Sequence, residues 1–229
     1  MDFSKFEKKA GVIFKNKNLL KQAFTHRSYI NENRDSKLEH NERLEFLGDA
    51  VLELVITNFL YSKFKNMSEG EMTSLRSALV NADTCATVAQ TLGANDFLLL
   101  SKGETKDTGR ARQYILANTL EAIIGAIYLD QDYDVVKDFI LSHIAPLTEN
   151  ILKDGTLIDA KSRFQEKAQE YKGPTPVYKT LDESGPDHDK HFTVGVYIGE
   201  ELYGKGEGKS KQDAEQEAAK NALETKGWK

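Results

Sequence analysis

The chain has 229 residues, of which 39% are hydrophobic and 29% are charged, as in an ordinary globular protein. No run of residues approaches the roughly 20 apolar positions of a membrane-spanning helix, so no membrane partner is expected. A single cysteine, Cys85, excludes an internal disulfide and predicts a reducing, cytoplasmic location. The net charge of −5 argues mildly against nucleic-acid binding, although a local basic patch can bind phosphates on an acidic protein.

Residues 3–30 carry apolar side chains at helical spacing, with a break at residues 15–18. A polar loop over residues 31–39 leads into the next predicted helix, residues 40–55. The apolar positions of this helix share one side, and they are Leu44, Leu47, Val51, Leu54 and Val55.

Four carboxylates form a stripe on the other side of the same helix, within roughly 60° of one another. They are Glu42, Glu45, Asp49 and Glu53. Like charges at this spacing repel, so the stripe is either a solvated acidic face or a site for a hard cation, which prefers oxygen ligands. Phe46 beside the stripe and Gly48 in the helix interior favour a surface that meets another molecule.

The segment from Asn41 to Asp49, NERLEFLGD, resembles the signature of the ribonuclease III family, which cleaves double-stranded RNA. The segment from Leu20 to Tyr29 is similar to the other N-terminal hallmark of the family. The resemblance implies that Glu45 and Asp49 are metal ligands and that Glu42 lies near the site. It also implies that Phe46 fills a pocket on a second subunit of a homodimer.

Ser68 and Glu71 form a capping-box pattern, and apolar residues then continue one helical stripe as far as Leu92–Gly93. The capping pattern explains the acidic residues here structurally. Glu69 matches a family position near the active site, so the resemblance gives it a supporting role. Residues 101–110 are polar and contain glycine, which predicts a loop.

The helix predicted for residues 114–129 is apolar around most of its circumference and is therefore buried. Asn118 and Glu121 stand three residues apart on one of its faces. A buried carboxylate must be paired, protonated or bound to metal, so Glu121 either pairs with an arginine such as Arg76 or ligates a metal ion. The acid-rich helix in the same domain favours the metal.

A last helix over residues 137–152 closes the first predicted domain, residues 1–152. Residues 157–226 then follow the order α-β-β-β-α, which resembles a double-stranded RNA-binding domain. The expected fold is therefore an all-α nuclease domain followed by a small α+β domain. Lys209 and Lys211 flank the start of the last helix, where backbone N–H groups favour a phosphate.

In family terms, Gln165 and Glu166 face one minor groove of the RNA and His188 reaches the next. Gln212 and Asp213 follow Lys211 where the family usually has adjacent basic residues, and this departure predicts weaker phosphate contact.

The resemblance implies hydrolysis of double-stranded RNA with Mg²⁺, for which Mn²⁺ can substitute, in the processing of ribosomal and messenger RNA. Asp49 and Glu121 would be catalytic, and Glu45, Asp49, Asn118 and Glu121 would hold the metal. Many relatives have Asp where this chain has Asn118. Two alternatives follow: a catalytically weakened, dimeric RNA-binding protein, or a helical phosphohydrolase of small nucleotides, which leaves the C-terminal domain unexplained.

Overall fold

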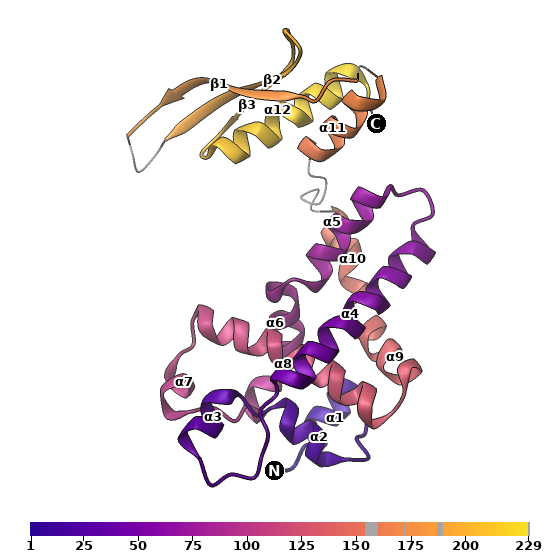
Figure 1. The fold of residues 1–229 in the computed structure, drawn as a ribbon, viewed down its shortest axis with the longest axis vertical. Helices are drawn as coiled ribbons and strands as arrows, with labels where there is room; N and C mark the ends of the chain where they lie inside the picture. Colours follow the sequence, from indigo (N-terminus) through magenta and orange to yellow (C-terminus); the bar gives the residue numbers. More distant parts are fainter. Residues whose placement is uncertain (154–159, 172, 187–189, 229) are drawn as a thin grey trace. The chain divides into compact units, whose positions relative to one another are not determined.

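The computed structural model describes residues 1–153, 160–171, 173–186 and 190–228. The chain divides into two compact units, residues 1–154 (the first unit) and residues 155–229 (the second unit). The first unit is helical, and the second consists of a three-stranded sheet with two helices (Figure 1). The expected fold class is confirmed. In the described ranges, no helix is long and apolar enough to cross a membrane.

The first unit contains ten α-helices and two short 3₁₀ segments, η1 and η2, in its described residues. The α-helices are α1 (Ser4–Ala10), α2 (Lys17–Ala23), α3 (Arg27–Glu32), α4 (Glu42–Lys63), α5 (Glu69–Val80), α6 (Ala82–Thr91), α7 (Lys102–Lys106), α8 (Arg110–Asp130), α9 (Tyr133–His143) and α10 (Thr148–Lys153). The 3₁₀ segments are Ala94–Phe97 and Ala145–Leu147.

Two local predictions for this unit are wrong. The stripe that continues to Leu92 is not one helix, because Asn81 adopts an extended backbone and its side chain caps α6 by accepting from the Thr84 N–H (2.9 Å). The polar segment 101–110 is not all loop, because Ser101 accepts from the Glu104 N–H (3.3 Å) and starts the short helix α7.

Helices α4 and α8 form the centre of the first unit, and their backbones touch where they cross (Figure 1). A Cβ on Gly48 would lie 1.7 Å from the backbone O of Glu121, and one on Gly125 would lie 2.2 Å from the O of Leu44. Glycine at both positions therefore permits this approach, and the crossing, not an external partner, explains Gly48. Around it α8 buries Ile115, Leu116, Leu120, Ile123, Ile124 and Ile127, each such side chain contributing about 1.5–3 kcal/mol.

The C-terminal end of α8 holds the segment between α1 and α2. The Asp130 carboxylate accepts from the backbone N–H groups of Lys15 and Asn16, both at 2.7 Å. Gln131 donates to the O of Ile13 at 3.1 Å. These contacts join residues more than 100 positions apart in the sequence.

The second unit contains α11 (Ala160–Tyr171), β1 (Val177–Ser184), β2 (His191–Ile198), β3 (Glu201–Gly208) and α12 (Lys211–Lys226). Its strands pair antiparallel in the order β1-β2-β3. Helix α12 lies directly on β3, because a Cβ on Gly206 would come within 2.1 Å of the backbone N of Ala218. The core is built on Phe164 and on Ala168, Val196, Tyr203, Ala218 and Ala222.

Candidate functional site

The crossing of α4 and α8 brings together the polar side chains that the sequence singles out on the two helices. Asn118 and Glu121 lie on α8, in a helix that is otherwise buried at this level. Glu45 and Asp49 lie on α4, on either side of the Gly48 contact with Glu121. The packing of the two backbones therefore fixes where the acidic groups meet.

The acidic groups act on one another electrostatically. Burial, together with the charges of Asp49 and Glu45, raises the pKa of Glu121 to about 7. Burial also raises the pKa of Glu45, together with the charges of Glu42 and Asp49, while a side-chain hydrogen bond from Asn118 lowers it. Glu45, Asp49 and Glu121 are thus near enough to act on one another electrostatically, and Asn118 forms a hydrogen bond with Glu45.

The alternative partner for Glu121 is wrong. Arg76 donates instead to Glu53 (Nε to Oε2, 3.0 Å) and to the hydroxyl of Thr57 (3.1 Å). Among the described residues, no ion pair involves Glu121. The Glu121 carboxylate is half-buried and is near the acids Asp49 and Glu45. Among the described residues it therefore has no ion-pair partner to offset its negative charge.

The two supporting residues have structural partners at the margin of the site. Arg27 donates to Glu42 at 3.2 Å, and His40 lies 3.8 Å from the same carboxylate. Glu69 accepts from the hydroxyl of Thr73 at 3.0 Å, while Glu71 completes the expected capping box with Ser68.

The chemistry of the donors fits a hard divalent cation. Glu45, Asp49 and Glu121 offer carboxylate oxygens, and Asn118 offers a carbonyl oxygen. A cation would relieve the repulsion that raises the pKa of Glu121. In the described ranges, however, no three His, Cys, Asp or Glu side chains already stand close enough together to hold a metal ion.

Phe46 is 82% exposed on α4, where the sequence places it outside the apolar face. It borders a cavity of about 630 Å³ whose lining combines apolar with polar and charged side chains, namely Leu19, Leu44, Leu47 and Leu129 with Gln22, Glu39, His40, Glu42 and Arg43. A large exposed aromatic beside a cavity with leucine side chains on the same surface suits contact between two copies of the chain.

In the second unit, Gln165 and Glu166 are exposed on α11, and Lys209 and Lys211 are exposed beside the start of α12. Ser210 caps α12 by accepting from the Asp213 N–H at 3.1 Å. The Lys211 ammonium lies 5.5 Å from the Phe192 ring centroid and 3.8 Å from Glu183, so part of its charge is already compensated. His188 lies outside the described residues.

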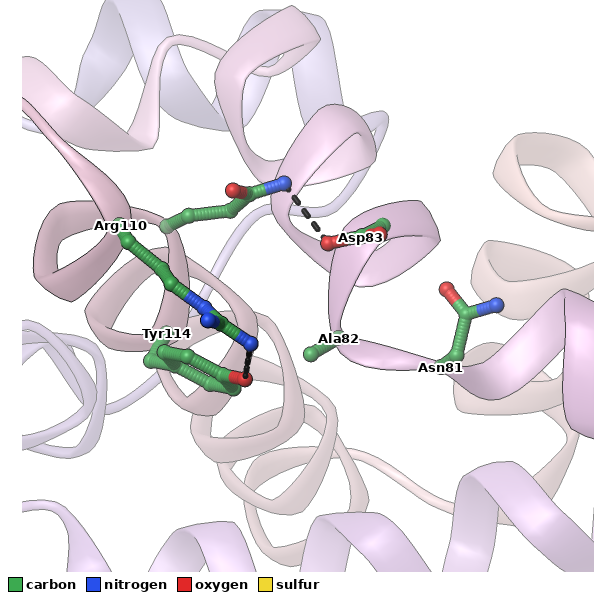
Figure 2. A pocket seen from close by; sticks show the side chains of 6 residues that line it. Asn81, Ala82, Asp83, Arg110 and Tyr114 are labelled. Atoms are coloured by element: carbon green, nitrogen blue, oxygen red, sulfur yellow. Dashed lines mark hydrogen bonds between the residues drawn. The ribbon is translucent and has the colours of Figure 1, made fainter. Parts of the chain in front are cut away.

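A second cavity, of about 650 Å³, lies between the start of α6 and the start of α8 and was not predicted from the sequence (Figure 2). It is lined by Asn81, Ala82, Asp83, Arg110, Gln113 and Tyr114. One signal was available, because Arg110, Tyr114, Asn118 and Glu121 are spaced four, four and three residues apart and so share a face of α8.

Comparison with known proteins places both units. Residues 16–147 match the family model described as Ribonuclease-III-like, and residues 160–226 match the double-stranded RNA binding motif. The chain is 47% identical to Ribonuclease 3 of Oceanobacillus iheyensis over 226 residues, which are 98% of each chain. It is 46% identical to Ribonuclease 3 of Protochlamydia amoebophila over 217 residues, covering 95% of this chain and 89% of the other.

A solved structure, the nuclease domain of ribonuclease III from Campylobacter jejuni, matches with a TM-score of 0.58 and 42% identity. The match covers 63% of this chain and 97% of that domain. The identities extend over nearly the whole chain, and both family models match in the expected order. The chain therefore belongs to the ribonuclease III family.

Proposed function

We propose that this protein is an endoribonuclease that hydrolyses phosphodiester bonds in double-stranded RNA with the help of a divalent metal ion. Residues 1–152 would form the nuclease domain and residues 157–226 the RNA-binding domain. The observation that carries the proposal is the α4–α8 crossing, where Glu45, Asp49 and Glu121 act on one another electrostatically and, in the part of the chain that the structure describes, no ion pair involves Glu121. Its substrates would be cytoplasmic ribosomal RNA precursors and messenger RNA.

Glu45, Asp49 and Glu121 would hold Mg²⁺, or Mn²⁺ in its place, with Asn118 contributing its carbonyl oxygen. When bound, the ion supplies an activated water and neutralises charge on the scissile phosphate. Asp49 and Glu121 are the catalytic residues of the proposal. Glu121, whose pKa is raised to about 7, is about half protonated near neutral pH, and a bound cation would favour its ionised form. The Asn118 amide orients the carboxylate of Glu45.

Glu42 and Glu69 would act at the edge of the site, since each is held by a neighbouring side chain. In the second unit, the exposed side chains of Gln165 and Glu166 would contact one minor groove, and His188 the next. Lys209 and Lys211 would contact phosphates. Such contacts depend on charge and not on base sequence.

The test of the site is Glu121→Gln, which preserves the size of the side chain and removes its charge. It should abolish cleavage of a duplex RNA in magnesium while leaving duplex affinity in calcium nearly unchanged, because the second unit supplies most of the binding. Glu53→Gln is the matched control, since Glu53 lies on the same stripe but is bound to Arg76. Cleavage by Glu121→Gln at a near wild-type rate would remove Glu121 from the site.

The proposal includes a homodimer in which each Phe46 packs against the leucine side chains of the corresponding cavity of the other subunit. Phe46→Ala should then weaken the dimer by about 2 kcal/mol or more, as expected for a buried aromatic anchor. Analytical ultracentrifugation over a range of low concentrations measures this change. Tyr61→Ala, which removes another exposed aromatic from α4, is the control. An unchanged dissociation constant for Phe46→Ala would refute the role of Phe46.

Asn118 favours a second candidate, a dimeric RNA-binding protein with a weakened site, because it supplies one neutral oxygen where a carboxylate would supply two charged ones. The same duplex assay separates the two functions. Binding without cleavage at any magnesium or manganese concentration is the result that the second candidate expects.

A further inference from the structure

The cavity between α6 and α8 has two chemically different walls. Arg110 and Tyr114, one turn apart at the start of α8, form one wall, and Asn81 and Asp83 come from the other side (Figure 2). The guanidinium carbon of Arg110 lies 5.8 Å from the Tyr114 ring centroid, and its Nη2 donates to the Tyr114 hydroxyl at 3.3 Å. The wall on α8 thus joins a cation to an aromatic face.

The charge of Arg110 is available to a ligand. Arg110 is exposed, and within the described parts of the chain no carboxylate forms an ion pair with it. Its hydrogen bond to Tyr114 uses one of five N–H donors. A guanidinium presented in this way suits a phosphate, which it can bind through two parallel hydrogen bonds.

Asn81 and Asp83 on the other side of the cavity, together with Gln113 of α8, present a defined set of hydrogen-bonding groups. Gln113 donates its amide to Oδ1 of Asp83 at 2.8 Å, which leaves its own carbonyl and Oδ2 of Asp83 as acceptors. The Asn81 carbonyl accepts from the Thr84 N–H, which leaves the Asn81 amide as a donor. Two acceptors and one donor match the guanine edge that carries N1–H, the N2 amino group and O6.

The position of the cavity relates it to the candidate metal site. Tyr114 and Glu121 lie on the same face of α8, seven residues apart, and therefore about 10 Å apart along the helix axis. This separation is comparable to the length of a few nucleotides of an extended RNA strand. An RNA strand that places a phosphodiester at Glu121 therefore passes the cavity within a few nucleotides.

We propose that the cavity between α6 and α8 binds one unpaired nucleotide of the RNA substrate, preferably guanosine. The base stacks on Tyr114, its edge meets Asp83, Gln113 and Asn81, and its phosphate meets Arg110. The inference rests on the proposed function, because that function makes RNA the ligand. A paired base cannot enter, since its edge and both faces are already occupied in the duplex. The substrate class becomes a duplex with an unpaired nucleotide close to the cleavage site.

The experiment compares a fully paired RNA duplex with duplexes that carry one unpaired guanosine, adenosine, cytidine or uridine at successive positions. Affinity is measured in calcium by fluorescence anisotropy with the full chain. The wild type should bind the duplex with unpaired guanosine about tenfold more tightly at one position, since stacking of a base on an aromatic ring has this magnitude. Tyr114→Ala and Arg110→Gln should reduce the ratio toward one, and Tyr114→Phe should retain it.

A spectroscopic readout tests the stacking itself. With 2-aminopurine as the unpaired base, binding should quench its fluorescence in the wild type and in Tyr114→Phe, but not in Tyr114→Ala. Tyr61→Ala, a matched loss of an exposed tyrosine, should quench as the wild type does. Circular dichroism establishes that each variant is folded.

The outcomes separate this inference from the proposed function. Equal affinity of the wild type for paired and unpaired substrates, or equal quenching with Tyr114→Ala, overturns the nucleotide site whatever the cleavage assay shows. Equal preference for all four bases overturns the assignment of the base edge. A wild type that never cleaves in magnesium, but selects the unpaired guanosine in calcium, overturns the proposed nuclease activity and supports the nucleotide site.

Discussion

In the first unit, Gly48 sets α4 against the backbone of Glu121, whereas in the second unit Gly206 sets β3 against the backbone of Ala218. Both contacts are too close for any residue other than glycine. They differ in whether the contacted residue belongs to a candidate functional site. The residue under Gly48 carries a candidate catalytic side chain. The residue under Gly206 belongs to the core, and the candidate RNA-binding residues Lys209 and Lys211 are exposed away from it. In the first unit, the helix contact that stabilises the fold therefore also positions a candidate catalytic residue. In the second unit, the contact that stabilises the fold and the candidate RNA-binding residues are separate.

The largest expected effect comes from Gly48→Ala. Its Cβ would lie 1.7 Å from the O of Glu121, so α4 and α8 must separate. We expect the free energy of unfolding of the first unit to fall by about 3 kcal/mol, at the upper end of the usual cost of overpacking. Cleavage should be lost at the same time, because the acidic groups move apart. Urea unfolding and the duplex assay measure the two effects.

Two glycine variants complete this test. Gly103→Ala is the control, since the nearest atom to its Cβ would be 3.9 Å away and α7 tolerates alanine. Gly206→Ala should destabilise the second unit and lower RNA affinity, and leave the unfolding transition of the first unit where it is. The comparison fails if Gly48→Ala unfolds like the wild type, or if Gly206→Ala destabilises both units alike.

The pH dependence of stability should differ between the units in metal-free protein. The pKa of Glu121 is about 7 in the folded first unit and near its ordinary value of 4.5 when unfolded, so the folded state binds more protons between these values. The free energy of unfolding should therefore fall by about 2–3 kcal/mol as pH rises from about 4.5 to 7. Glu121→Gln should remove most of this slope, and saturating magnesium should oppose it.

The second unit should respond with the opposite sign. The hydrogen bond between Glu183 and Lys190 lowers the pKa of Glu183. The contribution of this carboxylate to the stability of the second unit is therefore present above its ordinary pKa and is lost as pH falls. Unfolding curves recorded in EDTA at several pH values measure both units. A first unit whose stability does not change between pH 4.5 and 7, or changes equally in Glu121→Gln, would contradict the position of Glu121.

The smallest effect is expected for Asn118→Asp. The new carboxylate adds a negative charge to the site, at the expense of the hydrogen bond that Asn118 donates to Glu45. The variant should fold normally and reach half-maximal cleavage at a several-fold lower magnesium concentration, because the added charge attracts the cation. A magnesium titration measures this. A parent that is inactive at every magnesium and manganese concentration, beside an active variant, would favour the RNA-binding alternative.

Periodicity was sufficient to predict the parts of the fold that depend on neighbouring residues. The spacing of Glu45 and Asp49 places both on one side of α4, and strict alternation in residues 192–198 predicts β2. Asn81 shows where this reasoning fails. Apolar spacing continues through it, while a single side-chain cap is enough to end one helix and begin another.

Contacts between residues that are distant in the sequence limit how much of the candidate site could be predicted. The sequence shows a glycine at position 48, which destabilises a helix. The group that it contacts is the backbone of Glu121, 73 positions away, and a backbone contact leaves no mark in the side-chain pattern. Arg76 was a reasonable partner for Glu121 by charge, and only the packing of α5 against α4 assigns it to Glu53. The cavity at Arg110 depends in the same way on α6 meeting α8.

The hydrogen bonds of Asp130 also bear on how the protein is made. The amides of Lys15 and Asn16 leave the ribosome more than 100 residues before the carboxylate that binds them. During synthesis, the segment between α1 and α2 therefore lacks its hydrogen bonds to Asp130 until α8 has emerged. The second unit closes its own contacts within about 70 residues and has no such delay. The first unit is thus the one that completes its contacts later relative to the start of its own synthesis.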